Sequence, residues 1–131
     1  MSVELTMLVY ATGILIVCVL VQAFAGIFSR GLKTMAGPRD DLPPMDRFHA
    51  RASRTVDNHR EGLVMFAPLI LAAAVAGVSN QWTLLGAQIF FWARLVHAPL
   101  YWFGVPWLRA AAWGASLAAT VMVLLALVGV I

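Results

Sequence analysis

Polar residues in one segment recur at the spacing of a single helix face. Arg54, Asn58 and Glu61 stand at i, i+4 and i+7, which corresponds to about 0°, 40° and −20° around a helix that turns about 100° per residue. Arg51 precedes them on the same stripe. For Arg51 alone, a snorkelling side chain at a solvated helix end is the alternative explanation. Glu61 is different, because residues 62–78 carry no charged side chain and an acid at a lipid boundary needs a partner.

A second stripe follows in a later apolar region. Arg94, His97 and Tyr101 fall at about 0°, −60° and −20° on a helix. An arginine inside a membrane helix costs about 2.5–3.5 kcal/mol on insertion scales, and such residues normally face the bundle interior. We therefore expect Arg94 to be the partner of Glu61. A purely structural ion pair is the alternative, but it does not explain why His97 and Tyr101 continue the same face.

The two stripes together predict a polar pocket. Its side chains comprise three guanidinium groups, an amide, a carboxylate and a phenol, from Arg51, Arg54, Arg94, Asn58, Glu61 and Tyr101. This set suits a small zwitterionic ligand with several carboxylates and an amine, because arginine forks bind carboxylates and an acid binds an amine. Spacing alone does not identify the ligand.

The elements that must position these side chains are membrane helices. The chain has 131 residues, of which 62% are hydrophobic and 11% are charged, whereas globular proteins average roughly 45–50% apolar and roughly 25% charged residues. So few charged side chains cannot cover the surface of a soluble particle of this size. We therefore predict an all-α integral membrane protein in the lipid bilayer. This class excludes a secreted disulfide scaffold, a nucleic-acid module and a cytosolic enzyme.

Apolar runs define a single membrane domain, residues 1–131, built as a bundle of four transmembrane helices. An uncharged run of about 20 residues crosses the hydrocarbon core as a helix, and turn-forming residues separate such runs at 79–81 and 104–106. A cleaved signal peptide is the weaker reading of 5–28, because this run is too long and no basic segment precedes it. The helices are expected at about 4–28, 50–78, 82–103 and 107–130, with a loop at 29–49.

The basic residues set the expected orientation. Seven of the nine Lys and Arg residues lie between Arg30 and Arg60, and basic residues near helix ends are retained on the cytoplasmic side. The loop at 29–53 is therefore predicted to be cytoplasmic, and with four crossings both termini are non-cytoplasmic. Pro43-Pro44 prevents helix formation until Asp46, which we expect to cap the second helix.

Three further residues are not assigned to a site. Cys18 lies between two valines in the first apolar run, and we expect it to pack in the bundle without reacting. His49 and His59 have no companion at metal-ligand spacing, so no metal site is predicted.

The order and spacing of the motifs resemble the MAPEG family, the membrane-associated proteins in eicosanoid and glutathione metabolism. The similar motifs are Arg54-x3-Asn58-x2-Glu61 in the second helix and Arg94-x2-His97-x3-Tyr101 in the third. Segments 37–43 and 104–109 are similar to the bacterial, largely uncharacterised branch of this family. The resemblance covers nearly the whole chain. It implies a homotrimer in the bacterial inner membrane, with glutathione bound between neighbouring subunits near the cytoplasmic face.

The resemblance also implies roles for individual residues. The residues that contact glutathione in characterised relatives match Arg54, Asn58, Glu61, Arg94 and Tyr101. An arginine at the start of the fourth helix polarises the glutathione thiol in those relatives, and Arg109 is the candidate for this catalytic role here. Arg51 and His97 share the two stripes and complete the expected binding set.

Two functions are open at this point. The first is a glutathione-dependent membrane transferase or peroxidase that acts on a lipophilic small-molecule electrophile or hydroperoxide. The second is a non-catalytic protein of the same fold, either an accessory subunit of a larger membrane complex or a binder of another small polar or lipid ligand. A small four-helix drug/proton exporter is disfavoured, because such a chain needs a carboxylate within an early spanning helix and residues 5–28 have none.

Overall fold

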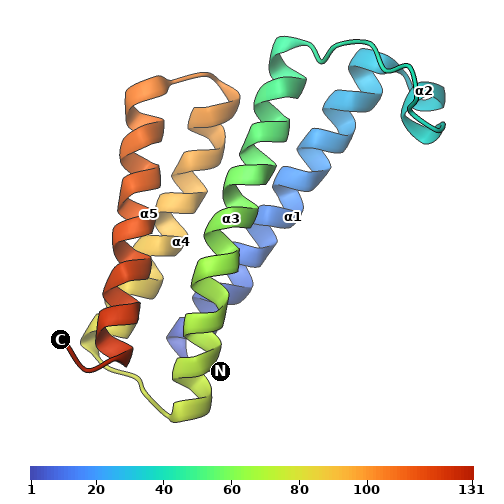
Figure 1. Cartoon of the computed structure of the whole chain (residues 1–131). Helices are drawn as coiled ribbons and strands as arrows, with labels where there is room; N and C mark the ends of the chain where they lie inside the picture. The colour runs from blue at the N-terminus through green and yellow to red at the C-terminus, as the bar shows by residue number, and fades with distance from the viewer.

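The chain is built from helices joined by short turns (Figure 1). The computed structural model describes every residue from Met1 to Ile131. The elements in chain order are α1 (Val3–Arg30), α2 (Leu32–Ala36), α3 (Arg47–Ala76), α4 (Gln81–Trp102) and α5 (Pro106–Leu127). Figure 1 shows the two termini and the α3–α4 turn at one end of the bundle, and α2 and the α4–α5 turn at the other.

Three of the four long helices, α1, α3 and α5, are long and apolar enough to cross a membrane. The prediction of four spanning helices is therefore met for three of them. α4 has 22 residues, which is a sufficient length, but Gln88, Arg94 and His97 make it more polar. Large apolar side chains such as Ile16 and Val64 are exposed around the bundle, as expected of a surface that faces lipid.

Local signals in the sequence set the starts of the long helices. Asp46 caps α3 as predicted, because its Oδ1 accepts a hydrogen bond from the backbone N–H of His49 at 2.7 Å. Asn80 caps α4 in a reciprocal capping box with Thr83. Pro106 is the first residue of α5, a position where the missing N–H of proline costs nothing.

The segment 29–49, expected to be a loop, contains more helix than the sequence indicates. α1 continues to Arg30, and the short helix α2 follows at Leu32–Ala36. Gly31 separates these two helices with a φ of 88°, a value that glycine adopts without the strain other residues incur. The side chain of Arg30 donates a hydrogen bond to the carbonyl oxygen of Pro43, which holds the returning chain near the end of α1.

The hydrophobic core lies where the four long helices meet. Phe66 of α3 stacks on Phe90 of α4, with ring centroids 3.8 Å apart. The other buried residues of this cluster come from α1, α3, α4 and α5, namely Leu8, Ala11, Ile70, Ala87, Ala119 and Val123. The stack fixes the rotation of α3 against α4. It therefore determines which residues of α3 and α4 face each other toward the end of the bundle that carries α2.

A polar cluster joins three elements at the end that carries the termini. Glu4 of α1 is 3% exposed, and its Oε1 accepts hydrogen bonds from Oγ of Ser79 at 2.8 Å and from Oγ1 of Thr83 at 2.7 Å. These contacts connect the start of α1 to the α3–α4 turn and to the first turn of α4. The only acid before the first apolar run is thus used to hold the bundle together.

Gly86 marks a close approach of α4 to α5. A Cβ on Gly86 would lie 2.7 Å from Cγ2 of Val123 and 3.0 Å from the carbonyl oxygen of Ala119. We expect Gly86→Ala to lower the free energy of unfolding by about 1–3 kcal/mol, as measured by denaturant unfolding in detergent. Gly114→Ala is the matched control, because a Cβ there meets nothing within 4 Å. Equal effects of the two substitutions would contradict the close approach.

Candidate functional site

Arg94 of α4 and Asn58 of α3 form the centre of the candidate site. Nη1 of Arg94 donates to Oδ1 of Asn58 at 2.5 Å, and the arginine is 4% exposed. Its guanidinium carbon lies 5.6 Å from the ring centroid of Phe90, within the range of a cation–π contact. The stack of Phe90 on Phe66 lies one turn from Arg94 along α4 and about two turns from Asn58 along α3. It holds the two helices in the rotation that brings Arg94 and Asn58 together.

Gly62 provides the space that the Arg94 guanidinium occupies. It follows Asn58 by one turn of α3, and a Cβ on Gly62 would lie 2.5 Å from Nη2 and 2.8 Å from Cζ of Arg94. Any larger residue at this position would therefore have to displace the guanidinium. Nε of Arg94 is buried without a partner in the protein. Because buried polar groups are normally hydrogen-bonded, this nitrogen is a donor that a ligand could use.

The next residue of the α4 stripe, His97, contacts His59 of α3. Nε2 of His59 lies 3.1 Å from Nδ1 of His97, and the two residues are 2% and 0% exposed. The second ring nitrogen of His97, Nε2, is buried and has no partner in the protein. His97 therefore contributes a second unsatisfied polar atom to the same region as Arg94.

Tyr101 and Arg109 extend the site toward α5. The ring of Tyr101 lies edge-on to that of His97, with centroids 5.6 Å apart. Cζ of Arg109 lies 4.6 Å from the centroid of the Tyr101 ring. Because α5 begins at Pro106, Arg109 projects from the first turn of α5, beside the end of α4. The α4 stripe and the predicted catalytic arginine thus form one contiguous group.

Arg51 reaches this end of the bundle from α3. Its guanidinium lies against Gly104 in the α4–α5 turn, where a Cβ would be 2.6 Å from Cζ of Arg51, and Gly104 has a φ of 72°. Arg51, Arg94 and Arg109 have no carboxylate oxygen within 4.0 Å. Three guanidinium groups without acidic partners create a positive potential that attracts anions.

Arg54 and Glu61 are not brought into this group. Both are exposed on α3, and the predicted ion pair between Glu61 and Arg94 is wrong, because Arg94 bonds to Asn58. The reason is the rotation of α3, in which Asn58 and Gly62 are the residues turned toward α4. Glu61 directly precedes Gly62, so it points about 100° away around the helix.

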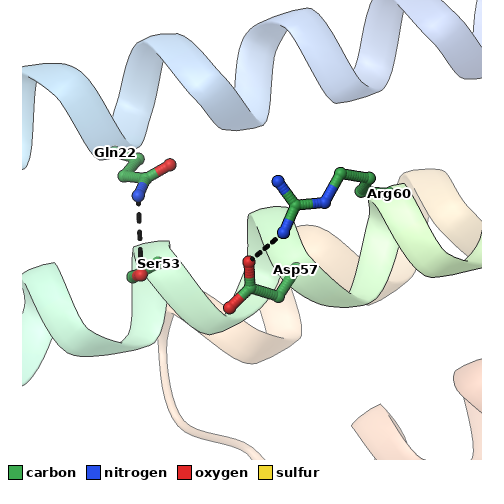
Figure 2. Close-up of polar contacts among 4 residues, drawn as sticks. All are labelled: Gln22, Ser53, Asp57 and Arg60. Carbon is green, nitrogen blue, oxygen red and sulfur yellow. Dashed lines mark hydrogen bonds and ion pairs between the residues drawn. The ribbon is translucent and has the colours of Figure 1, made fainter.

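Figure 2 shows polar contacts on the exposed part of α3 and between α3 and α1. Nη2 of Arg60 lies 2.9 Å from Oδ1 of Asp57, one turn earlier, and this is the only ion pair in the chain. Nε2 of Gln22 in α1 donates to Oγ of Ser53 at 3.4 Å. Arg54 and Glu61 consequently have no ion-pair partner within the chain.

The model of the MAPEG family matches residues 7–129, which is nearly the whole chain. The chain belongs to the MAPEG family. No curated protein and no solved structure matches it. With three apolar helices of spanning length, this MAPEG chain is an integral membrane protein of a family that includes glutathione transferases and peroxidases. The resemblance inferred from the motifs is thereby confirmed at the level of the family.

Sequence reasoning missed three residues that shape the site of this MAPEG chain, namely His59, Gly62 and Gly104. The signal for Gly62 was present, because it stands four positions after Asn58 on the polar stripe and a glycine there leaves room for a neighbour. The contact between His59 and His97 joins residues 38 positions apart. No local periodicity could have indicated that contact.

Proposed function

We propose that this MAPEG protein is a glutathione-dependent membrane transferase or peroxidase that acts on a lipophilic electrophile or hydroperoxide. The observation that carries the proposal is the set of three guanidinium groups without a carboxylate partner, those of Arg51, Arg94 and Arg109. Unpaired cations at membrane depth are costly, so an anionic ligand is their natural partner. Glutathione carries two carboxylates, one ammonium group and a thiol that can ionise.

Each charged group of glutathione has a counterpart either in the group around Arg94 or among the exposed residues of α3. The forks of Arg94 and Arg51 suit carboxylates, and the unsatisfied Nε of Arg94 gives its fork a second donor beside the contact with Asn58. Glu61, exposed near Asn58 on α3, suits the ammonium group. The remaining members of the proposed binding set are Arg54, His97 and Tyr101.

We assign the thiol to Arg109. A free thiol with a pKa near about 8.5 is mostly protonated at neutral pH, and lowering that pKa by about two units requires about 2.7 kcal/mol. One guanidinium about 4 Å away supplies about 4 kcal/mol at the effective dielectric constant of a protein surface. The thiolate sulfur then attacks a substrate that arrives from the bilayer. With an electrophilic carbon, an S–C bond forms as the leaving group departs with its bonding electrons. With a hydroperoxide, an S–O bond to the outer oxygen forms as the O–O bond breaks, and the alkoxide that leaves takes up a proton to become the alcohol.

The proposed assembly is a homotrimer with glutathione bound between neighbouring subunits. Arg54 and Glu61 support it, because both are exposed near the membrane entry of α3 and lack ion-pair partners in their own chain. A neighbouring subunit would shield them from lipid. In this assembly α4 is the fourth spanning helix, with Arg94 and His97 on the face that is buried against α3.

The proposed site lies at the end of the bundle that carries α2 and the basic segment (Figure 1). Basic residues at this end include Arg30, Lys33 and Arg39, and such residues are retained in the cytoplasm. We therefore place the segment 29–53 and the site on the cytoplasmic side of a bacterial inner membrane. Both termini then lie on the non-cytoplasmic side.

Titration of the purified protein with glutathione, followed by thiolate absorbance, tests the proposed function. The wild type should give a saturating thiolate signal. Arg109→Met should still bind glutathione within about fivefold of the wild type, because a thiol pKa about two units lower adds no more than that factor to the affinity near neutral pH, but it should give no thiolate signal. Arg47→Met, which removes an exposed arginine at the start of α3, is the control and should retain both.

Two outcomes would redirect the assignment. Binding by the wild type with no thiolate signal would exclude the catalytic role and leave a protein that binds glutathione. No binding at all by a folded, assembled protein would favour an accessory subunit of a larger membrane complex, or a binder of another polar or lipid ligand.

A further inference from the structure

His59 and His97 form a buried imidazole pair, and the proposed function gives no role to His59 or to the contact between the two rings. Nε2 of His59 lies 3.1 Å from Nδ1 of His97, and the ring centroids are 5.1 Å apart. Both residues are almost fully buried. The other nitrogen of His97, Nε2, is also buried and contacts no hydrogen-bond partner in the protein. The contact therefore links His59, which is outside the predicted binding set, to His97, which belongs to it.

The direction of the hydrogen bond decides what His97 offers to a ligand. If His59 donates, Nδ1 of His97 accepts and Nε2 of a neutral His97 carries the proton. If His97 donates, its Nε2 is an acceptor. A further proton on the pair would add a charge beside the guanidinium groups of Arg94 and Arg109, so these arginines favour the neutral pair.

The neighbours of His97 favour the first arrangement. Arg94 stands one turn earlier on α4, and Arg109 stacks on Tyr101, whose ring contacts that of His97. Arginine side chains donate hydrogen bonds and never accept them. A ligand group that satisfies these arginines must therefore be an acceptor, and it would accept a hydrogen bond from an N–H of His97 as well.

We propose that His59 is a positioning residue that donates its Nε2–H to Nδ1 of His97 and so holds His97 as the Nε2–H tautomer, with this N–H as a donor to an anionic group of the ligand. The identity of that ligand as glutathione rests on the proposed function. The tautomer and its dependence on His59 do not.

Nitrogen NMR of protein labelled with [15N]histidine tests the proposal directly. The chain has only three histidines, so each imidazole can be assigned by its own substitution. In the wild type, we expect Nδ1 of His97 to give a pyridine-type signal and Nε2 to give a pyrrole-type signal. His59→Met should convert His97 into a mixture of tautomers and raise the dissociation constant for glutathione about tenfold.

Two further variants separate positioning from packing. The side-chain amide of His59→Gln can still donate to His97, so this variant should keep the wild-type tautomer and bind glutathione within about threefold of the wild type. His49→Gln removes a buried imidazole outside the site and should change neither measurement.

Two NMR results would overturn the proposal. These are an Nδ1–H tautomer of His97 in the wild type, and an Nε2–H tautomer that persists unchanged in His59→Met. A third combination of results would separate the two proposals. If the wild type shows the expected tautomer and His59→Met loses it, but the wild type does not bind glutathione, the proposed function is refuted and the role of His59 stands.

Discussion

Replacement of Arg94 by methionine is expected to weaken glutathione binding about a hundredfold, which corresponds to about 2.7 kcal/mol. Arg94 is buried, donates one hydrogen bond to Asn58 and has no carboxylate within 4.0 Å. Its Nε has no partner. Hydrogen bonds to charged groups contribute about 1.5–3 kcal/mol each, so the loss of a charge-assisted contact with a ligand carboxylate accounts for the expected change.

The same substitution should leave the free energy of unfolding nearly unchanged. An arginine at the centre of a membrane helix costs about 2.5–3.5 kcal/mol, and methionine fills a similar volume without that cost. Leaving the amide of Asn58 without its partner costs about 1–3 kcal/mol, so the two effects are comparable in size. If Arg94 instead formed a buried ion pair with a carboxylate such as that of Glu61, the same substitution would lower the free energy of unfolding by about 3–5 kcal/mol, because it would leave the acid without its partner.

Calorimetric titration with glutathione and unfolding in detergent measure the two effects of the Arg94 substitution. Arg94→Lys keeps the charge but lacks the planar fork, and its affinity should lie between those of the wild type and Arg94→Met. Arg47→Met should retain both wild-type values. Unchanged affinity together with a large loss of stability in Arg94→Met would assign Arg94 a structural role.

Gly62→Ala is expected to weaken glutathione binding at least about tenfold and to lower the free energy of unfolding by about 1–3 kcal/mol. The added Cβ would lie 2.5 Å from Nη2 of Arg94, so the guanidinium must move away from Asn58. Arg94 is only 4% exposed, which leaves little room for that movement. Misplacing the fork removes the geometry on which recognition of a carboxylate depends.

A double variant tests whether Gly62 acts through Arg94. In the Arg94→Met background the guanidinium is absent, so Gly62→Ala should no longer destabilise the protein, and alanine then gains up to about 1 kcal/mol over glycine in a helix. Gly13→Ala is the control, because a Cβ on Gly13 meets nothing within 4 Å. The same penalty for Gly62→Ala in both backgrounds would show that its effect arises elsewhere.

The course of the long helices was predictable because it depends on local signals. Uncharged runs identify helices of membrane length, Asp46 follows two prolines, and Asn80 precedes Thr83 at capping-box spacing. The short helix α2 was not predicted, since a single turn of helix after Gly31 carries no periodicity to detect. α4 does not meet the criterion of apolar composition for a membrane span. The polar residues that contribute to the candidate site, Arg94 and His97, are among those that lower its hydropathy.

Helix periodicity predicted which polar residues share a face of one helix, but it did not predict the contacts that they make. A stripe on a helix identifies residues that share a face, yet the rotation of that face depends on packing such as the stack of Phe66 on Phe90. That rotation turns Gly62 toward Arg94 and leaves Glu61 exposed. The role of a glycine becomes visible only when the side chain that fills its space is known.

The most direct test of a glutathione site at Arg94 is equilibrium binding of radiolabelled glutathione to the purified protein in lipid nanodiscs. We expect the wild type to bind glutathione saturably, and unlabelled glutathione to displace the label. Gly13→Ala should bind with the same affinity, whereas the affinity of Arg94→Met should be about a hundredfold lower. If wild-type protein that has full helical content and unfolds cooperatively shows no saturable binding, the proposed site is contradicted.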